Sequence, residues 1–491
     1  MGQTLFQQLT RSKQVELKSE EVQDQGSAAL HRSMGLFPLT MIGVGATIGT
    51  GIFFTMAVAV PKAGPAVILS FLIAALTAGL TALCYAELSF RSPSTGSAYS
   101  FAYASLGEFA AFVVAACLLL EYGLACSAVA IGWSDYVNNF LQNTIGWQIP
   151  DSLHLPMVVL GATGGVEFHP GQFNLPPVIL IILCCILLCK GTKESATTNA
   201  IMVVIKLVIL LFFVAIALIG FDSHNFFPFF NTDNSQGLAG MAGVTAASGT
   251  VFFSFIGLDT IATAGSEVDN PKRNVPIGIM AALGIVTVFY LLVAVAALGA
   301  QPASKFAGQE AGLAVILQQV TGKTWPAVVL SAGAIISVFS ITLVSIFGQT
   351  RILYAVARDG LAPQIFRKVN AKTHAPISNT VIVSVIVAIV AALVDANFLW
   401  DMVSMGTLTA FIIVAIAVPV MRKKSDPTIR GGFRVPFGPY LVPALSVAAC
   451  FYIMKDLSDL TFRVFVIWMV VFIALYFAYG MRHSKLRQPQ D

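Results

Sequence analysis

The sequence predicts an all-α polytopic membrane protein with twelve transmembrane helices. Of its 491 residues, 57% are hydrophobic and only 11% are charged, and the mean hydropathy is +0.82. Soluble domains carry about 25% charged residues, so the composition excludes an ordinary soluble protein. A hydrocarbon core about 30 Å thick takes about 20 apolar residues of helix. The expected spans are residues 36–60, 63–87, 107–136, 175–190, 196–220, 242–266, 275–299, 325–350, 377–394, 397–421, 438–455 and 462–481.

The distribution of basic residues predicts the orientation. With the N-terminus inside, most of the 28 Lys and Arg residues fall in loops on the inner side, as the positive-inside rule requires. The stretch from Val137 to Gln172 contains no Lys or Arg and is therefore expected outside. Both termini are then cytoplasmic, as the tails 1–34 and 482–491, and the chain is a multi-pass protein of the cell membrane.

Several other classes of protein are disfavoured. The seven cysteines fall inside or at the edges of the spans, which argues against a disulfide framework. A net charge of +4 gives no reason to expect a nucleic acid partner. No cleavable signal peptide is expected, because the first 35 residues are polar. No metal-ligand spacing or nucleophile with a nearby base occurs in the spans, so we expect neither an enzyme nor a cofactor or metal site.

The first span contains a glycine-rich stretch from Ile42 to Phe54, with four glycines in a charge-free run. Glycine at this density makes the helix easy to unwind, and unwound backbone at membrane depth is tolerated only where it lines a cavity or is buried in protein. The alternative is helix packing through the small residues Gly45 and Gly49. A dinucleotide-binding motif is rejected, because no strand precedes the glycines.

A second interruption is expected in the sixth span, from Phe253 to Asp259 around Gly257. Two interrupted spans at matching places in two halves of a chain indicate the substrate site of a secondary transporter. If residues 35–220 and 221–421 are the two five-helix units, they are inverted relative to each other, and residues 422–481 add two more helices. Half-helix ends offer amide donors to a carboxylate and carbonyl acceptors to an ammonium, which suggests an α-amino acid as the substrate.

Three ionisable residues lie within the expected spans. Glu121 lies midway along the third span, where a carboxylate costs at least about 2.5 kcal/mol and so indicates function, or else forms a protonated structural contact. Lys206 lies about 15 Å deep in the fifth span, at 1.5 Å per residue. It is a candidate proton carrier or one member of a structural ion pair. Asp259 follows the second break and either caps the restarted half-helix or handles protons.

Several motifs together resemble the amino acid-polyamine-organocation superfamily and, within it, the bacterial members of the cationic amino acid transporter family. The resemblance spans about residues 30–480. The motifs that carry it are Gly45 to Phe53, Leu120-Glu121-Tyr122, Ala130 to Ser134, Lys206, Phe253 to Asp259, Glu267-Val268 with Asn270-Pro271, Gln349-Thr350-Arg351, Ala357 to Gly360 and Phe433 to Pro436.

The resemblance implies the LeuT-like fold of two inverted five-helix repeats plus two extra helices. It also implies that the amides of Thr50 and Gly51 hold the substrate carboxylate, and that the carbonyls of Ala46, Thr47, Phe253 and Ile256 hold the amino group. The full set of expected substrate-binding residues is Ala46, Thr47, Ile48, Thr50, Gly51, Glu121, Phe253 and Ile256, with Phe253 also acting as the outer gate.

For coupling, the resemblance implies proton symport. Lys206 is similar to a lysine that takes the place of a sodium ion near Gly45 and Ile48, and Asp259 completes the expected proton-coupling set. Glu121 matches an acidic position that influences which side chain is bound, cationic or small and neutral.

The leading hypothesis is therefore a proton-coupled symporter that imports L-amino acids by alternating access. The alternatives are an amino acid exchanger without proton coupling and, less favoured, a membrane amino acid sensor. The expected partners are the amino acid, protons and the lipid bilayer. A small membrane subunit is a further candidate partner.

Overall fold

The computed structural model describes residues 8–12, 34–91, 98–160, 165–190, 196–231, 239–263, 268–309, 311–370, 375–424 and 433–487. Most of the expected tail 1–34 lies outside these ranges, as does Glu267 of the quoted motifs. The structure is almost entirely helical, with one short antiparallel hairpin that pairs β1 (Val158–Leu160) with β2 (Val166–Phe168).

Helices occupy each part of the chain that was expected to be apolar. In chain order they are α2 (Leu36–Thr47), α3 (Thr50–Ala63), α4 (Val67–Arg91), α5 (Ala98–Ser105), α6 (Glu108–Ile145), α7 (Leu175–Cys189), α8 (Ala196–Ala217), α9 (Met241–Phe252), α10 (Thr260–Thr263), α11 (Pro271–Ala300), α12 (Gly312–Thr321), α13 (Trp325–Arg358), α14 (Ile377–Leu393), α15 (Ala396–Lys424), α16 (Leu441–Met454), α17 (Asp459–Leu475) and α18 (Met481–His483).

Eight helical stretches in the described ranges are long and apolar enough to cross a membrane. They are Gly51–Arg91, Glu108–Ile145, Ile201–Gly220, Met241–Ala262, Pro271–Ala300, Trp325–Arg358, Ala396–Lys424 and Asp459–His483. Further apolar helices, including α7, α14 and α16, are shorter. The protein is therefore an all-helical, multi-pass membrane protein.

Several predicted helix boundaries differ from those of the structure. The second span was expected to start at residue 63, but Gly64 (φ 65°) and Pro65 form a turn, so α4 starts at Val67 and continues to Arg91. The third span was expected to end at residue 136, but α6 continues to Ile145. It stops where Gly146 takes a left-handed conformation with φ 70°, as glycine commonly does after a helix.

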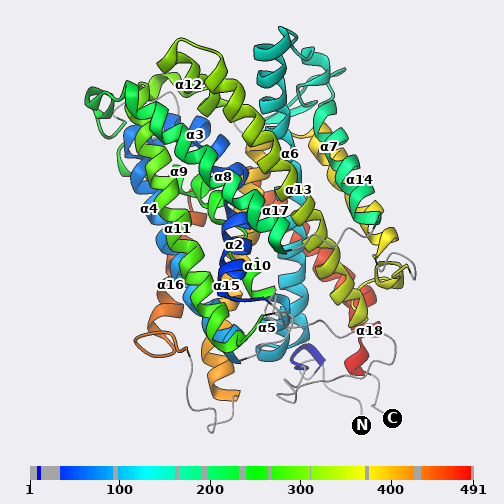
Figure 1. Cartoon of the computed structure of the whole chain (residues 1–491). Helices are drawn as coiled ribbons and strands as arrows, with labels where there is room; N and C mark the ends of the chain where they lie inside the picture. Colours follow the sequence, from blue (N-terminus) through cyan, green and yellow to red (C-terminus); the bar gives the residue numbers. More distant parts are fainter. Residues whose placement is uncertain are drawn as a thin grey trace.

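The two interrupted helices lie inside the bundle. The half-helices α2 and α3 contact α11 and α9 respectively, and α10 contacts α2. Helix α6 packs against α13 and α15, while α7 and α14 lie side by side at one edge (Figure 1). This arrangement puts both breaks at the centre, away from the lipid-facing helices.

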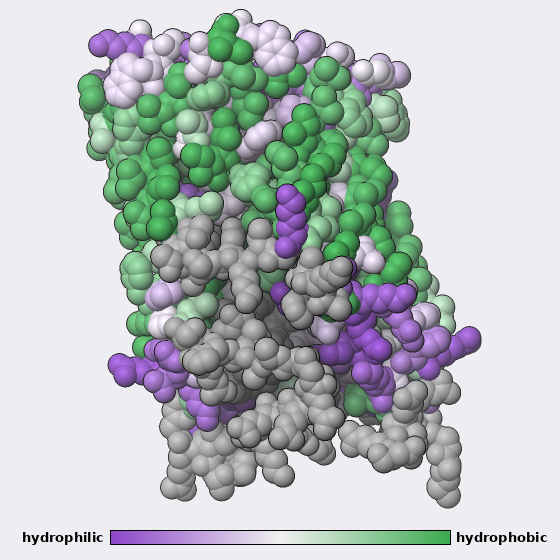
Figure 2. Space-filling view, turned by 45° about the vertical axis from the view of Figure 1, so that its right-hand side comes forward, coloured by the Kyte–Doolittle hydropathy of each residue, from purple (hydrophilic) through white to green (hydrophobic). Residues whose placement is uncertain are grey.

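The two ends of the bundle differ in character. Helix α12 lies at one end, and α5 and α18 lie at the other (Figure 1). Figure 2 shows a broad apolar band over the described surface, with hydrophilic side chains gathered below it, toward the α5 and α18 end. That surface pattern is the one expected of a protein seated in a bilayer.

A buried ion-pair network ties helices together near the α5 end. Glu87 of α4 is fully buried, and its carboxylate accepts hydrogen bonds from Arg422 (Nη2 to Oε2, 2.5 Å) and Arg91 (Nε to Oε1, 2.9 Å). The amide of Val435 donates to the same carboxylate at 2.8 Å. Because Val435 belongs to the quoted Phe433 to Pro436 motif, this network explains what the motif does: it fixes the segment before α16 against α4 and α15.

We expect Glu87→Gln to destabilise the protein by about 3 kcal/mol, because the change leaves the Arg422 and Arg91 guanidinium groups without their buried counter-charge. The free energy of unfolding, measured by denaturant titration in mixed micelles, checks this. Glu167→Gln is the control, since the Glu167 side chain is 62% exposed. Equal stability of the two variants would contradict the structural role of the network.

Candidate substrate site

The first break separates α2 from α3 at Ile48 and Gly49. Ile48 (φ −76°, ψ 89°) and Gly49 (φ −134°, ψ −118°) both leave the helical conformation. A Cβ at Gly49 would lie 1.6 Å from Cδ1 of Ile341, so the Ile341 side chain would have to move to admit one. The last carbonyls of α2 and the first amides of α3 therefore have no partners within their own helices.

The second break follows α9. A 3-10 turn over Phe253–Phe255 leads to Ile256, which is extended (ψ 146°), and then to Gly257, which has φ 102°. A Cβ at Gly257 would lie 2.7 Å from the carbonyl oxygen of Ala46. Glycine is required here for both reasons, and the close approach puts the backbone of the second break directly against the first.

Tyr290 of α11 links the two breaks. Its hydroxyl oxygen lies 2.8 Å from the carbonyl oxygen of Thr47 and 2.7 Å from that of Ser254, and donates to them. The Tyr290 side chain is fully buried. A Cβ at Gly51 would lie 2.4 Å from Cα of Ser254, and the hydroxyls of Thr55 and Ser254 are 2.8 Å apart. The two breaks thus form one packed unit.

A small cavity opens at this junction. Its volume is about 50 Å³. Residues from both breaks and from α6 and α13 line it: Ala46, Thr47, Gly51, Glu121, Tyr122, Ala125, Val129, Phe253, Ile256, Gly257, Thr260, Ile341, Val344 and Ser345. Four of the seven lining residues from α6 and α13 are apolar: Ala125, Val129, Ile341 and Val344.

One carboxyl group lines the cavity, and a second contacts the lining residue Tyr122. Glu121 is 3% exposed and lines the cavity, and Asp259 is 5% exposed and follows the second break. The hydroxyl of Tyr122 donates to Oδ2 of Asp259 at 3.2 Å. This bond joins α6 to the second break.

Lys206 reaches the first break from α8. The residue is 2% exposed, and its Nζ donates to the carbonyl oxygen of Gly45 at 3.2 Å. A buried amine at the end of α2 stabilises that break most when it is charged, because an ammonium is a stronger donor to a carbonyl than a neutral amine. The contact with Gly45 is the one that the sequence resemblance implied.

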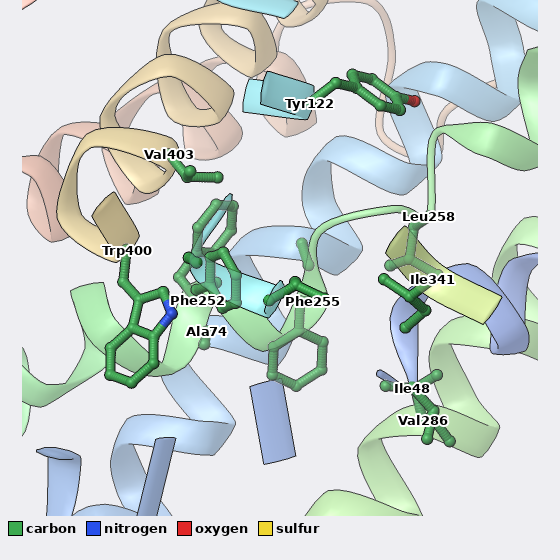
Figure 3. Close-up of a cluster of buried hydrophobic side chains, with 14 of the residues drawn as sticks. Ile48, Ala74, Tyr122, Phe252, Phe255, Leu258, Val286, Ile341, Trp400 and Val403 are labelled. Atoms are coloured by element: carbon green, nitrogen blue, oxygen red, sulfur yellow. The ribbon is translucent and has the colours of Figure 1, made fainter. Parts of the chain in front are cut away.

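Phe253 closes the cavity on the α15 side. Its ring lies 6.1 Å from that of Trp400, centroid to centroid, and each residue is 7% exposed. Figure 3 shows Trp400 with Phe252 and Val403 on one side of the apolar cluster. The indole Nε1 of Trp400 is buried and has no hydrogen-bond partner among the residues that the structure describes.

The structure brings most of the expected site residues together. Of the residues expected to bind substrate, Ala46, Thr47, Gly51, Glu121, Phe253 and Ile256 line the cavity. Ile48 does not line it: its side chain is fully buried and points toward Val286 of α11 (Figure 3). Thr50 is the first residue of α3, and its side chain lies outside the described structure.

Sequence reasoning did not identify several residues that lie at or near the junction of the two breaks. Tyr290 and Trp400 were not singled out, although a polar aromatic in an apolar span was a visible signal for Tyr290. The apolar lining residues Ala125, Val129, Ile341 and Val344 carry no signal that separates them from ordinary packing.

Comparison with known proteins assigns the chain to a transporter family. The sequence model of the family described as amino acid permease matches residues 34–478. The branched-chain amino acid permease BcaP of Bacillus subtilis is 36% identical over 463 residues, which cover 94% of this chain and 96% of that protein. The methylthioribose transporter of the same organism is 38% identical, with the same coverage. Human cationic amino acid transporter 4 is 34% identical over 86% of this chain and 64% of its own length.

Replacing Gly257 with alanine tests the contact between the two breaks. We expect Gly257→Ala to lower stability by about 2 kcal/mol, because a side chain at φ 102° is strained and its Cβ meets the Ala46 carbonyl. Gly284→Ala on α11 is the matched control: nothing lies within 4 Å of its added Cβ, and alanine favours a helix by about 1 kcal/mol. Thermal midpoints in detergent micelles should therefore move in opposite directions, and a shared direction would contradict the contact.

Proposed function

We propose, from the premise that the chain belongs to the amino acid permease family, that this protein imports L-amino acids. The proposed mechanism is proton-coupled symport with alternating access. The observation that supports this most directly is the cavity at the junction of two broken helices, lined by residues of both breaks and by Glu121 and apolar residues of α6 and α13. Interrupted helices that meet at mid-membrane are the usual substrate site of secondary transporters.

The zwitterionic part of the substrate is bound by the broken backbone. The free amides at the start of α3, from Thr50 and Gly51, receive the carboxylate, since a helix N-terminus attracts an anion. The carbonyls of Ala46, Thr47, Phe253 and Ile256 receive the α-ammonium group. All of these residues except Thr50 line the cavity, which supports the assignment.

The side chain of the substrate lies against α6 and α13. Ala125, Val129, Ile341 and Val344 offer apolar contacts, while Glu121 offers a carboxyl group. Small neutral and cationic amino acids both fit this combination. The relatives are named for branched-chain amino acids, methylthioribose and cationic amino acids, so they leave the substrate class open.

Lys206 couples the proton to the substrate. When charged, its ammonium holds the Gly45 carbonyl and so stabilises the first break in the geometry that binds substrate. Burial disfavours the charged form once this contact is lost. Release of the proton toward the cytoplasm therefore weakens the first break and releases the amino acid.

The conformational cycle uses the symmetry of the chain. Residues 35–220 and 221–421 form two inverted five-helix repeats, with α16 and α17 as additions, and both termini are cytoplasmic. Phe253, packed against Trp400, closes the outer path over the bound substrate. Because each break belongs to the first helix of its repeat, movement of one repeat against the other opens the site to either side in turn.

Uptake of radiolabelled alanine and arginine into proteoliposomes tests this function. An inward gradient of one pH unit should drive up to about tenfold accumulation for one coupled proton, since one unit is worth about 1.4 kcal/mol. Lys206→Ala should lose that accumulation and bind substrate more weakly than the wild type, because it lacks the ammonium that holds the Gly45 carbonyl. Lys305→Ala is the control, because Lys305 is exposed.

Accumulation that ignores the gradient and needs amino acid preloaded inside the vesicles would instead identify an exchanger. Binding of amino acids with no uptake under either condition would identify a sensor. Both outcomes would make Lys206 a structural charge.

A further inference from the structure

The ends of three apolar helices meet at the α5 and α18 end of the bundle. Helix α13 ends at Arg358, α14 begins at Ile377, and α17 leads through a π-helical turn (Tyr476–Gly480) into α18. Between α13 and α14, a 3-10 turn (Gln364–Arg367) packs against both helices. Because α13, α14 and α17 are apolar, the segments that join or follow them here lie at the edge of the bilayer.

The C-terminal segment is fixed against the end of α13. The amide of Lys485 donates to the carbonyl oxygen of Asp359 at 3.2 Å. Gly360 has φ 86°, and a Cβ there would overlap the carbonyl oxygen of His483. These backbone contacts hold Lys485 close to Arg358, the last residue of α13.

Buried side chains anchor the same segment from inside. Glu108, the first residue of α6, is fully buried and accepts hydrogen bonds from the hydroxyls of Ser484 and, at 3.1 Å, Tyr476. The hydroxyl of Tyr99 in α5 donates to Oδ2 of Asp359 at 2.8 Å. The one acidic side chain at the end of α13 is therefore turned into the protein, and it does not neutralise the surface.

Four exposed basic residues gather around this junction. Arg358 ends α13, Arg367 and Lys368 lie at the end of the 3-10 turn, and Lys485 lies in the C-terminal segment. None of the four forms an ion pair with the residues that the structure describes. The surface therefore carries positive charge on a rigid backbone, with no acidic partner of its own.

Apolar side chains lie beside these charges. Ile365 is 43% exposed and Val369 is 48% exposed, on either side of Arg367 and Lys368 along the chain, while Phe366 packs against the core. Exposed apolar residues next to basic ones are typical of a segment that lies in the interface of a bilayer. The turn thus presents charge to head groups and apolar surface to lipid chains.

We propose that this surface, which we call the basic interface and define as Arg358, Arg367, Lys368 and Lys485, binds the phosphate head group of an anionic phospholipid. Clusters of four or more basic residues next to a membrane span fit anionic lipid, and a guanidinium matches phosphate oxygens in pairs. The lipid belongs to the leaflet at the α5 and α18 end. Its chains lie along the bundle beside the 3-10 turn. This inference does not rest on the amino acid transport proposed above.

Lipid titrations followed by native mass spectrometry test the inference on the whole protein in micelles of uncharged detergent. The wild type should bind phosphatidylglycerol at least about 30-fold more tightly than phosphatidylcholine with the same chains. The preference should shrink at about 1 M salt, where charges are screened beyond about 3 Å. Glycerol 3-phosphate at the same concentration should not compete, because it has no chains.

The double variant Arg367→Gln, Lys368→Gln supplies the second readout. Its affinity for phosphatidylglycerol should fall by at least about tenfold, and its weak binding of phosphatidylcholine should not change. The matched control is Lys423→Gln, Lys424→Gln, which removes two exposed charges at the end of α15. The control should bind both lipids as the wild type does. All the changed side chains are exposed, so both variants should keep the thermal midpoint of the wild type without added lipid.

Several results would overturn the inference. Equal affinity of the wild type for the two lipids would do so, as would full competition by glycerol 3-phosphate. An unchanged preference in Arg367→Gln, Lys368→Gln would also contradict it. An equal loss in both double variants would show a general attraction of anionic lipid to basic residues instead of a site. Because no step measures uptake, each of these results would leave the proposed amino acid transport standing.

Discussion

The structure depends on the requirement that every backbone amide and carbonyl at membrane depth find a partner. Two helices are broken at the centre of the bundle, so each exposes groups that a continuous helix would satisfy. The breaks meet these needs by packing on each other: Gly257 lies against the Ala46 carbonyl, and Tyr290 donates to Thr47 and Ser254. The groups left over face the cavity, where a zwitterion can bind them.

Four buried ionisable residues differ in the partners that they contact. Glu87 is bound by two guanidinium groups and a backbone amide, and this network holds helices together. Glu121 and Asp259 have no basic partner in the described chain, and Lys206 contacts a backbone carbonyl of the first break. A satisfied charge stabilises one conformation, whereas an ionisable group deep in a membrane protein commonly marks a substrate or ion path.

Much of the site could be predicted from the sequence, because its main determinants are local. Glycine clusters mark where a helix can unwind, and a charge deep in an apolar span is visible without coordinates, so both breaks, Lys206 and Glu121 were found. Tyr290 and Trp400 were not, since their importance comes from what they touch across the bundle. Ile48 was misplaced for a related reason: the turn of the unwound backbone decides which side chains face the cavity.

A cryo-EM structure with L-alanine bound tests the central claim most directly. The account predicts that the carboxylate of alanine lies on the amides of Thr50 and Gly51, and that its ammonium lies among the carbonyls of Ala46, Thr47, Phe253 and Ile256. The methyl group should face α6 and α13. Alanine bound elsewhere, with the junction of the two broken helices empty, would contradict the account.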